Sequence, residues 1–452
     1  MVNWKDPWHP EAGGAEAYAW RMARHLLSAG ALVTYVTARP SAQARDDNRD
    51  GVPIVRGGGR WTVYPWVLWW LWRHRRDFDA VIDCQNGIPF FSPWVLPRRT
   101  AIVCVIHHVH DRQFELHFGP LLARIGQWLE GPVARRAYRR AVTVAVSPST
   151  VTALRERLGW QGPVVVIPNG MESSGGTGSE VSARAEAPAL LCVGRLAVHK
   201  RVERLLDVVE DLGERWPGLR LDVVGNGPVL PALRATVAER GLADRVILHG
   251  FLPTAERDEL VSRAWLHLSA SHGEGWGLVV LEAARAGLPT VAYDVDGLRD
   301  AVLHGETGWL APHDGDFTTA VDEALTVLAD PDRAATTAAA CRRWAAGFSW
   351  DGSGERMRAV LDDLLAPGAV PWSEQSVVAV AVVADPPAVA ERLRAALPER
   401  CRVDAEAGSL RLLAPAVPAE ALLTALAAAG ISRESVTVRT PLPTELLGGG
   451  AA

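Results

Sequence analysis

The amino-acid sequence predicts an α/β protein with two doubly wound parallel sheets, followed by a small α+β domain of the ferredoxin-like kind. The first observation is that helical segments alternate with short, continuous apolar runs, which is typical of strands buried on both faces of a parallel sheet. The second is a Gly- and Ser-rich stretch at 171–189, after which the alternation starts again. The third is the order strand–helix–strand–strand–helix–strand after residue 373.

Residues 1–170 form the first predicted Rossmann-like domain. A helix at 16–31 ends at a glycine stop and is followed by a strand at 32–38. Four later apolar runs predict further strands, at 78–84, 100–107, 142–147 and 163–169. We expect these strands to form one sheet with helices on both faces.

Residues 186–349 form the second predicted Rossmann-like domain. Its predicted strands lie at 190–196, 219–225, 245–250, 264–271 and 289–294, and helices at 201–216, 229–241 and 278–287 separate several of them. A further helix at about 350–366 is predicted to return to the first domain. A second linker then leads to the accessory domain, residues 373–445.

Composition and cysteine usage indicate a globular protein of a reducing compartment. The 452 residues are 48% hydrophobic and 22% charged, which fits a large core. The five cysteines are scattered without a CxxC pair, so we interpret them as buried thiols. The N-terminal stretch lacks the apolar segment of a signal peptide, and the most apolar window, 63–72, is shorter than the about 20 residues needed to span a bilayer. These features predict a cytoplasmic location.

The charge is unevenly distributed along the chain. Residues 1–170 carry 21 Lys and Arg against 13 Asp and Glu, whereas the remainder carries 26 against 39. This asymmetry predicts that the first half meets an anionic partner. We expect a membrane surface or lipid-linked acceptor, and no nucleic acid.

The stretch HGEGWGLVVLE at 272–282 places two glutamates eight positions apart. Glu274 lies in a glycine-rich turn after a predicted strand, and Glu282 lies about 7 Å along the following helix. Two such carboxylates can accept hydrogen bonds from separate polyol groups of one ligand, with phosphates near the helix N-terminus. A nucleoside-diphosphate sugar has this layout. The predicted helix N-terminus comprises Gly275, Trp276, Gly277 and Leu278. The alternative is a capped helix with a solvent-facing glutamate.

A basic motif, VGRLAVHK at 193–200, follows the first strand of the second domain. A diphosphate leaving group gains negative charge as its bond to the sugar breaks, so cations such as Arg195 and Lys200 stabilise the transition state more than the ground state. The alternative for this motif on its own is two surface cations at a strand end.

Several motifs in this order, over residues 9–366, resemble those of the retaining glycosyltransferases of family 4. They are PEAGGAE, VIPNG, VGRLAVHK, VVGNGP, HGEGWGLVVLE and HGETGWL. The resemblance implies the GT-B fold, in which two Rossmann-like domains face a cleft. It also implies transfer from a nucleotide sugar, with front-face substitution and without a metal or other cofactor.

The resemblance implies roles for individual residues. Arg195 and Lys200 would bind the diphosphate, Glu274 the donor sugar and Glu282 the ribose. His107, the first histidine after the strand at 100–107, would face the donor sugar across the cleft.

The glycine loop before the first helix can also bring backbone amides to a diphosphate or acceptor. Gly13 and Gly14 form this loop, and Glu16 is interpreted either as part of it or as an acid of the first helical turn. A dinucleotide-binding fingerprint is the other interpretation of such a loop, but GxGxxG is absent. Only MVNW precedes KDPWHPEAGG, where the family has a full strand, so we expect either a very short strand or a start upstream.

Three histidines, His107, His108 and His110, invite a zinc interpretation. Two of them are adjacent, and no Asp, Glu or Cys cluster accompanies them, so we predict no metal site. His110 is interpreted as structural.

Residues 60–76 hold five tryptophans and end in basic residues. Trp66, Trp69, Trp70 and Arg73 have helical spacing, which predicts either an interfacial helix at an anionic membrane or a helix that covers the first sheet. The basic run RRAYRR at 135–140 extends the predicted membrane face.

The last domain resembles the small C-terminal domain of some ABC-transporter ATPase subunits, on its element order and the ending TPLPTELL. We interpret it as a docking or regulatory module, with an exporter as the expected docking partner. A GT-B phosphorylase or epimerase, or a catalytically silent carbohydrate-binding or scaffold protein with the same fold, are the alternatives to a transferase.

Overall fold

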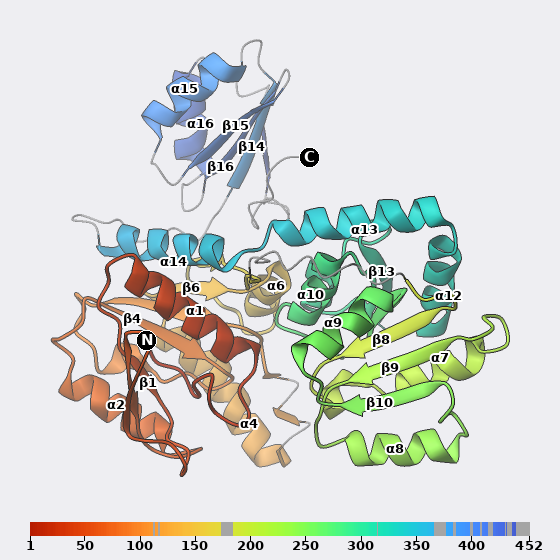
Figure 1. Ribbon diagram of the computed structural model, residues 1–452. Coiled ribbons are helices and arrows are strands. Elements are labelled where there is room, and N and C mark those ends of the chain that lie inside the picture. The colour runs from red at the N-terminus through yellow and green to blue at the C-terminus, as the bar shows by residue number, and fades with distance from the viewer. Residues whose placement is uncertain are drawn as a thin grey trace. The chain divides into compact units, whose positions relative to one another are not determined.

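The computed structural model describes residues 1–111, 114–115, 118–172, 184–313 and 315–365, together with seven short segments of the last domain. Those segments are 377–382, 386–397, 401–406, 409–414, 419–429, 431 and 436–439. The chain divides into two compact units (Figure 1). The first comprises Met1–Ile167 and Gly354–Ala452, and the second comprises Pro168–Ser353.

The first unit contains a mostly parallel sheet. Strands β1 and β3 are parallel, and β4, β5, β6 and β7 are parallel neighbours in chain order. The elements are α1 (Gly14–Ser28), β1 (Tyr35–Thr37), β2 (Asp46–Arg49), β3 (Val52–Arg56), α2 (Val63–Arg73), β4 (Ala80–Gln85), η1 (Ser92–Trp94), β5 (Ala101–Ile106), α4 (Pro120–Trp128), the π-helical turn η2 (Leu129–Val133), α5 (Ala134–Ala137), β6 (Val142–Ala145), α6 (Pro148–Glu156), β7 (Val164–Val166) and most of α14 (Trp350–Leu365).

Before the glycine loop, a single bridging residue stands where we expected either a very short strand or a start upstream. Val2 pairs in parallel with both β1 and β4, and thereby joins the β1–β3–β2 group to the β4–β7 group. Its N–H donates to the Ile82 carbonyl at 2.8 Å, and its carbonyl accepts from Cys84 N–H at 2.9 Å. Val2 is 1% exposed, as befits the centre of a sheet.

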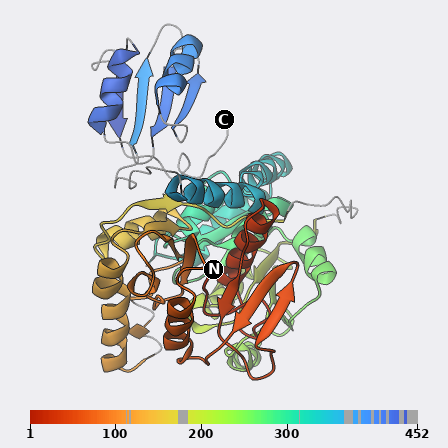
Figure 2. The same cartoon turned by 90° about the vertical axis from the view of Figure 1, so that its left-hand side faces the viewer.

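A hairpin in this sheet was not predicted from the sequence. Strand β2 has the sequence DDNR and pairs antiparallel with β3 (Figure 2). Asp50 and Gly51 link them, with φ of 50° and 84°, which is the left-handed pair of a two-residue hairpin turn. The four polar residues of β2 lack the apolar alternation that marks a strand, although the Asp-Gly pair was a usable signal.

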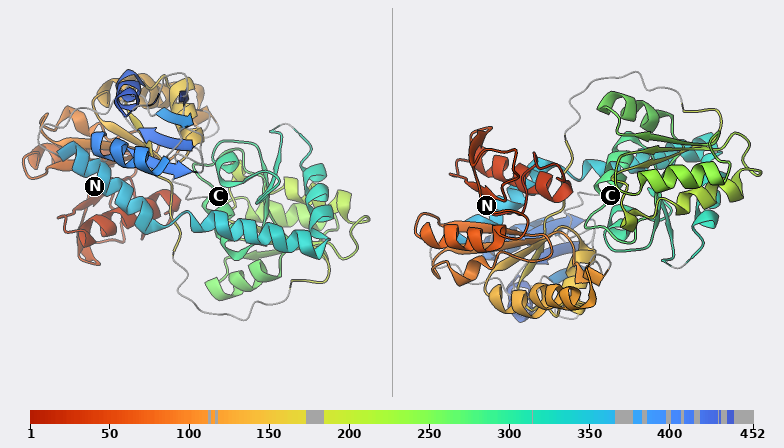
Figure 3. Two further views of the ribbon diagram at one scale, coloured as in Figure 1. Left: turned by 90° about the horizontal axis from the view of Figure 1, so that it is seen from above. Right: turned by 90° about the horizontal axis from the view of Figure 1, so that it is seen from below.

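The second unit is a six-stranded, fully parallel sheet in the order β10–β9–β8–β11–β12–β13. In chain order this is 3-2-1-4-5-6, the doubly wound arrangement. Helix α10 contacts α9 and α13, helix α12 contacts α7, and helices lie on both faces of the sheet (Figure 3). The elements are β8 (Ala189–Val193), η3 (Val198–Lys200), α7 (Arg204–Leu212), β9 (Arg220–Val224), α8 (Leu230–Glu239), β10 (Val246–Gly250), α9 (Thr254–Arg263), β11 (Leu266–Ser269), α10 (Leu278–Ala286), β12 (Thr290–Tyr293), α11 (Leu298–Ala301), β13 (Gly308–Ala311), α12 (Phe317–Leu328) and α13 (Pro331–Ala346).

The last segments form a four-stranded antiparallel sheet in the order β15–β16–β14–β17. With two helices this is the predicted ferredoxin-like arrangement, and it has a hydrophobic core of its own that includes Leu393, Leu412 and Leu422. The elements are β14 (Val377–Val382), α15 (Pro386–Ala396), β15 (Arg402–Glu406), β16 (Ser409–Ala414), α16 (Ala419–Ala428) and β17 (Val436–Arg439).

Helix α2 separates the tryptophans that the sequence placed on one face. Trp70 is 8% exposed and packs with Val63, Val67 and Leu71 in the core of the first unit, whereas Trp69 is 53% exposed. The interpretation of α2 as a helix that covers the first sheet therefore holds for Trp70, whereas Trp69 is left at the surface. Among the described residues, no helix has both the length and the apolar character needed to cross a bilayer.

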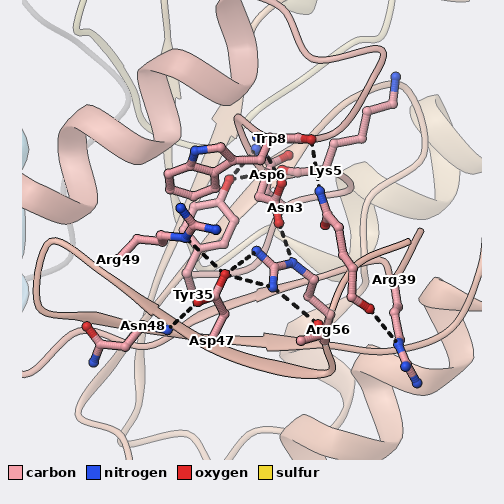
Figure 4. A network of polar contacts seen from close by, with 12 residues as sticks. Asn3, Lys5, Asp6, Trp8, Tyr35, Arg39, Asp47, Asn48, Arg49 and Arg56 are labelled. Atoms are coloured by element: carbon pink, nitrogen blue, oxygen red, sulfur yellow. Dashed lines mark hydrogen bonds and ion pairs between the residues drawn. The ribbon is translucent and has the colours of Figure 1, made fainter. Parts of the chain in front are cut away.

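A buried polar network fastens the loop after Val2 to the β2–β3 hairpin (Figure 4). Arg56 donates to Asp6 at 2.6 Å, and each side chain is 1% exposed. The same guanidinium contacts Asp47 at 3.3 Å, and Asp47 also accepts from the exposed Arg49 at 3.0 Å. The start of the chain is thus held by a charge pair taken out of water.

We predict that Arg56→Met lowers the free energy of unfolding by about 3–5 kcal/mol, because it leaves the buried Asp6 carboxylate without a partner. Chemical denaturation measures this loss. The matched control is Arg49→Met, which removes an exposed partner of the same Asp47 and should cost less than about 1 kcal/mol. Equal costs for the two variants would contradict the prediction.

Candidate functional site

The strand order of the second unit reverses between β8 and β11. Connections from these two neighbouring strands leave in opposite directions, and ligands of doubly wound sheets bind in the crevice that opens there at the carboxyl ends. The loop after β8 carries Arg195 and Lys200, and the loop after β11 carries Glu274. The sheet topology therefore brings the predicted basic motif and the first predicted glutamate to one point.

Lys200 and Glu274 form an ion pair at this point. The Lys200 ammonium donates to Glu274 Oε1, with the two side chains 24% and 19% exposed. Burial alone would raise the pKa of Glu274, but the charge and hydrogen bond of Lys200, with a hydrogen bond from Ser271, outweigh burial and lower it. Glu274 is therefore an anion whose remaining oxygen can accept a further hydrogen bond.

Backbone contacts hold the two loops together. Arg201 donates through Nε to the Ala270 carbonyl at 2.8 Å and through a terminal nitrogen to the Ser271 carbonyl at 3.3 Å. The His272 N–H donates to the His199 carbonyl at 2.8 Å. These contacts pre-position Lys200 and Glu274, so that no loop has to be ordered when a ligand arrives.

The Glu274 loop also depends on a glycine from another segment. The Glu274 N–H donates to the Asp296 carbonyl at 2.9 Å, and the following Gly297 has φ of 78°. A Cβ at Gly297 would lie 2.4 Å from the Glu274 carbonyl oxygen. Only glycine fits here, for both conformation and space.

Helix α10 begins beside this pair, as predicted. Its N-cap is Gly277, with φ of 88°, and the first N–H groups of a helix have no partner within the helix. Trp276 is 2% exposed, and its ring lies 5.1 Å from that of Phe348. The Trp276 side chain therefore packs in the core, which explains a large aromatic residue between Gly275 and Gly277, and its Nε1 is buried without a hydrogen-bond partner among the described residues.

The remaining predicted residues of this unit lie nearby in the fold. Leu278 is the first residue of α10, and Glu282 lies on the exposed face of the same helix. The pKa of Glu282 is raised because surrounding protein shields its carboxyl, although Arg257 and Arg285 act against this. Arg195 is exposed, and within the described part of the chain its side chain has no ion pair.

Sequence reasoning missed Arg201 and Gly297. Arg201 directly follows the predicted basic motif, but nothing in the sequence showed that it bonds to carbonyls 69 and 70 positions away. Gly297 lies in the sequence YDVDG at 293–297, and its role depends on a contact with Glu274 that only the folded chain makes.

The predicted residues of the first unit lie at the carboxyl ends of its own strands and at α1. His107 follows β5, is 8% exposed and has its ring 5.0 Å from that of Tyr18. Burial, and then the nearby His110, lower the pKa of His107 to about 3, so this imidazole is neutral. Its Nε2 is buried without a hydrogen-bond partner among the described residues.

One backbone amide of the glycine loop is already hydrogen-bonded to a nearby side chain. The Gly13 N–H donates to Glu16 Oε2 at 2.7 Å, and burial raises the pKa of Glu16. The Gly13 amide thus serves the start of α1, while Gly14 is the first residue of that helix.

The other histidine contacts are structural. His110 donates its backbone N–H at 2.7 Å to the fully buried Glu130. Among the described residues, no group of three or more His, Cys, Asp or Glu is placed to hold a metal ion.

Comparisons with known proteins give a consistent result. A family model described as Glycosyltransferase Family 4 matches residues 12–174, and one described as Glycosyl transferases group 1 matches residues 179–344. The chain is similar to a GDP-mannose-dependent α-(1-6)-phosphatidylinositol monomannoside mannosyltransferase of Mycolicibacterium smegmatis. Identity is 30% over 381 residues, which are 78% of this chain and 95% of that protein.

Two solved structures share the fold. One is sucrose-phosphate synthase from Thermosynechococcus elongatus, with 20% identity and a TM-score of 0.65 over 80% of this chain and 98% of that chain. The other is Anabaena HepE in complex with UDP and glucose, with 18% identity and a TM-score of 0.59 over 80% and 98%.

We predict that Gly297→Ala displaces the Glu274 loop and costs about 2–4 kcal/mol of stability, since it combines a left-handed backbone strain with a steric overlap. Gly305→Ala is the control, because Gly305 has φ of 80° with nothing within 4 Å of an added Cβ. Thermal or chemical unfolding of both variants measures the difference. A Gly305→Ala cost as large as that of Gly297→Ala would show that overlap with Glu274 is unimportant.

We predict that Lys200→Met makes stability depend on pH in the opposite sense from the native pair. In the native protein the pKa of Glu274 is lowered, so its ionised form stabilises the fold at any pH above the unfolded pKa of about 4.3. This stabilisation is lost as the pH falls through the folded pKa. Without Lys200, burial raises this pKa, so stability is lost as the pH rises. The destabilisation by Lys200→Met should be about 1–3 kcal/mol at pH 7 and smaller near pH 4.

Unfolding measured between pH 4 and pH 8 tests this, with Lys200→Met/Glu274→Gln as the control that removes the titrating group. A destabilisation that did not change with pH would contradict the charge pairing.

Proposed function

The chain belongs to the glycosyltransferases of family 4, and on that premise we propose that it is a retaining enzyme acting in cell-envelope synthesis. It would move a hexosyl group from a nucleoside-diphosphate sugar to a saccharide or lipid-linked acceptor. The expectations of the GT-B fold and of glycosyltransferase activity are confirmed by the family matches and the structural neighbours. The donor, the acceptor and retention are proposals.

The Lys200–Glu274 pair at the strand reversal is the observation that carries this proposal. It places a fixed cation and a fixed anion side by side at the mouth of a doubly wound sheet, next to the N-terminus of α10. A nucleotide sugar has matching parts, namely a diphosphate for Lys200 and hydroxyl groups for Glu274. Arg195 on the same loop is exposed and can add a second cation to the diphosphate.

The reaction we propose breaks the bond between the anomeric carbon and the diphosphate oxygen. The acceptor hydroxyl forms the new bond from the same face, and its proton passes to the departing phosphate oxygen. Lys200 and Arg195 stabilise the negative charge that develops on the leaving group, and Glu274 orients the sugar. Glu282 would bind the ribose. His107, neutral at physiological pH, would offer a hydrogen-bonding ring nitrogen to the sugar.

We further propose that no metal ion or other cofactor takes part. The positive field that a divalent cation would supply to a diphosphate is supplied by the two cations and the helix N-terminus. Support for a lipid-linked acceptor comes from the Mycolicibacterium relative, whose name specifies a phosphatidylinositol mannoside. Docking to an exporter through residues 373–445 stays a prediction; the family matches end at residue 344.

We predict that Glu274→Ala and Lys200→Ala each reduce transfer by at least about 100-fold, because each removes a charged contact to the donor. Because the acceptor is unknown, a thermal-shift screen of nucleotide sugars first identifies the donor, and its hydrolysis and transfer are then measured. Glu239→Ala, which replaces an exposed glutamate at the end of α8 in the same unit, is the control and should be fully active.

The same assay in the presence of EDTA should show unchanged turnover, and NMR of the product should show the anomeric configuration of the donor. Near-normal turnover by either alanine variant would refute the site, inversion would refute the retaining mechanism, and loss of turnover in EDTA would refute the metal-free proposal.

A further inference from the structure

Helix α4 is folded with its large apolar side chains outward. Leu121, Leu122, Ile125 and Trp128 are 73%, 59%, 45% and 58% exposed. Their spacing places them along one side of a helix. The side that faces the protein instead presents small residues, which include Ala123. This is the reverse of a helix that covers a core, where the large apolar residues point inward.

The inward side of α4 is shaped for close contact. Gly126 is buried, and a Cβ added to it would lie 2.7 Å from the ring of Phe114. Phe114 is itself 8% exposed. The helix is therefore held in a defined place by its small residues, and the outward position of the large ones is not a consequence of fraying.

The exposed apolar surface continues to the start of α2. The rings of Trp61 and Phe118 lie 6.1 Å apart at their centroids, and each of these residues is two positions before its helix, α2 or α4. Trp61 is 57% exposed, and on α2 the tryptophans Trp69 and Trp72 are 53% and 50% exposed. Single exposed apolar residues are ordinary, but seven large ones, six on these two helices and Trp61 before α2, indicate a surface that meets a partner.

The charges around these helices are mostly positive, although Glu115 accepts from Gln127 of α4 at 2.9 Å and Asp77 lies 3.0 Å from His74 after α2. Every charged residue exposed between residues 118 and 140 is an arginine, because the single acid there, Glu130, is fully buried. They are Arg124, Arg135, Arg136, Arg139 and Arg140. The segment 60–76 carries Arg60, Arg73, Arg75 and Arg76 and no acid.

We propose that this surface, α4 with the exposed tryptophans of α2, docks the protein on an anionic lipid membrane. The aliphatic side chains of α4 enter the boundary between headgroups and acyl chains, and the tryptophans lie at headgroup level. The surrounding arginines bind lipid phosphates, each contributing attraction that acts within a Debye length. The exposed arginines complement the phosphates of anionic lipid. A second copy of this chain would instead bring the same cations together.

The inference does not rest on the proposed reaction, since none of these residues belongs to the donor site. It differs from the interfacial stripe predicted for residues 60–76, because the principal contact is α4 and the buried Trp70 takes no part.

Flotation of the full chain with vesicles tests the proposal. We expect binding to phosphatidylcholine vesicles that contain phosphatidylglycerol, weaker binding to phosphatidylcholine alone, and weakening of the former by salt. The triple variant Leu121→Ser/Ile125→Ser/Trp128→Ser should lose about 100-fold or more in vesicle affinity, because each buried apolar side chain contributes roughly a factor of ten. The control is Leu32→Ser, a fully exposed leucine of the same unit outside this surface.

Two further measurements separate the outcomes. The unfolding temperature of the triple variant should match that of the native chain, since the replaced side chains are exposed, and its thermal shift with a nucleotide sugar should be unchanged. Size-exclusion chromatography of the native chain shows whether α4 instead joins two copies. A native dimer that the triple variant dissociates, or a native chain that does not float with anionic vesicles, would overturn the proposal without affecting the proposed reaction.

Discussion

The reversal of strand order between β8 and β11 is the constraint on which the candidate site depends. Two loops that leave neighbouring strands in opposite directions cannot cover the space between them, so the edge of the sheet stays accessible there. The chain places a lysine on one loop and a glutamate on the other, and the two charges meet at partial burial. A pair in this environment keeps Glu274 ionised and both side chains in fixed positions, ready for a ligand with its own charge and hydroxyl groups.

Around this pair, the protein uses backbone contacts more than further side-chain charges. Arg201 reaches the carbonyls of Ala270 and Ser271, and Gly297 allows the chain to pass against the Glu274 carbonyl. Such contacts hold a loop without competing for the charges that a substrate needs. The buried Trp276 has the same effect, since packing of its indole against Phe348 anchors the turn before α10. Precise placement of a few polar groups on a rigid support is what a glycosyl-transfer reaction requires.

The first unit also contains a mostly parallel sheet, but different contacts hold its parts in place. Its central strand is Val2 alone, and the loop that follows is held by the buried Asp6–Arg56 pair. On the surface of this unit, α4 exposes leucine, isoleucine and tryptophan side chains among arginines.

The sequence by itself determined the class of fold and the residue types of the candidate site. Continuous apolar runs can be buried only between two layers of helices, and the glycines with Glu274 and Glu282 marked the turn into α10 at its observed start. Tertiary structure alone decided which of these residues meet. The Lys200–Glu274 contact joins positions 74 apart, the DDNR strand is held by pairing rather than by its own pattern, and α2 and α4 are sorted into core and surface by what packs beneath them. The physical reason is that the periodicity of one segment shows only which of its faces can be buried. Strand pairing and side-chain exposure depend on which other segments pack against it.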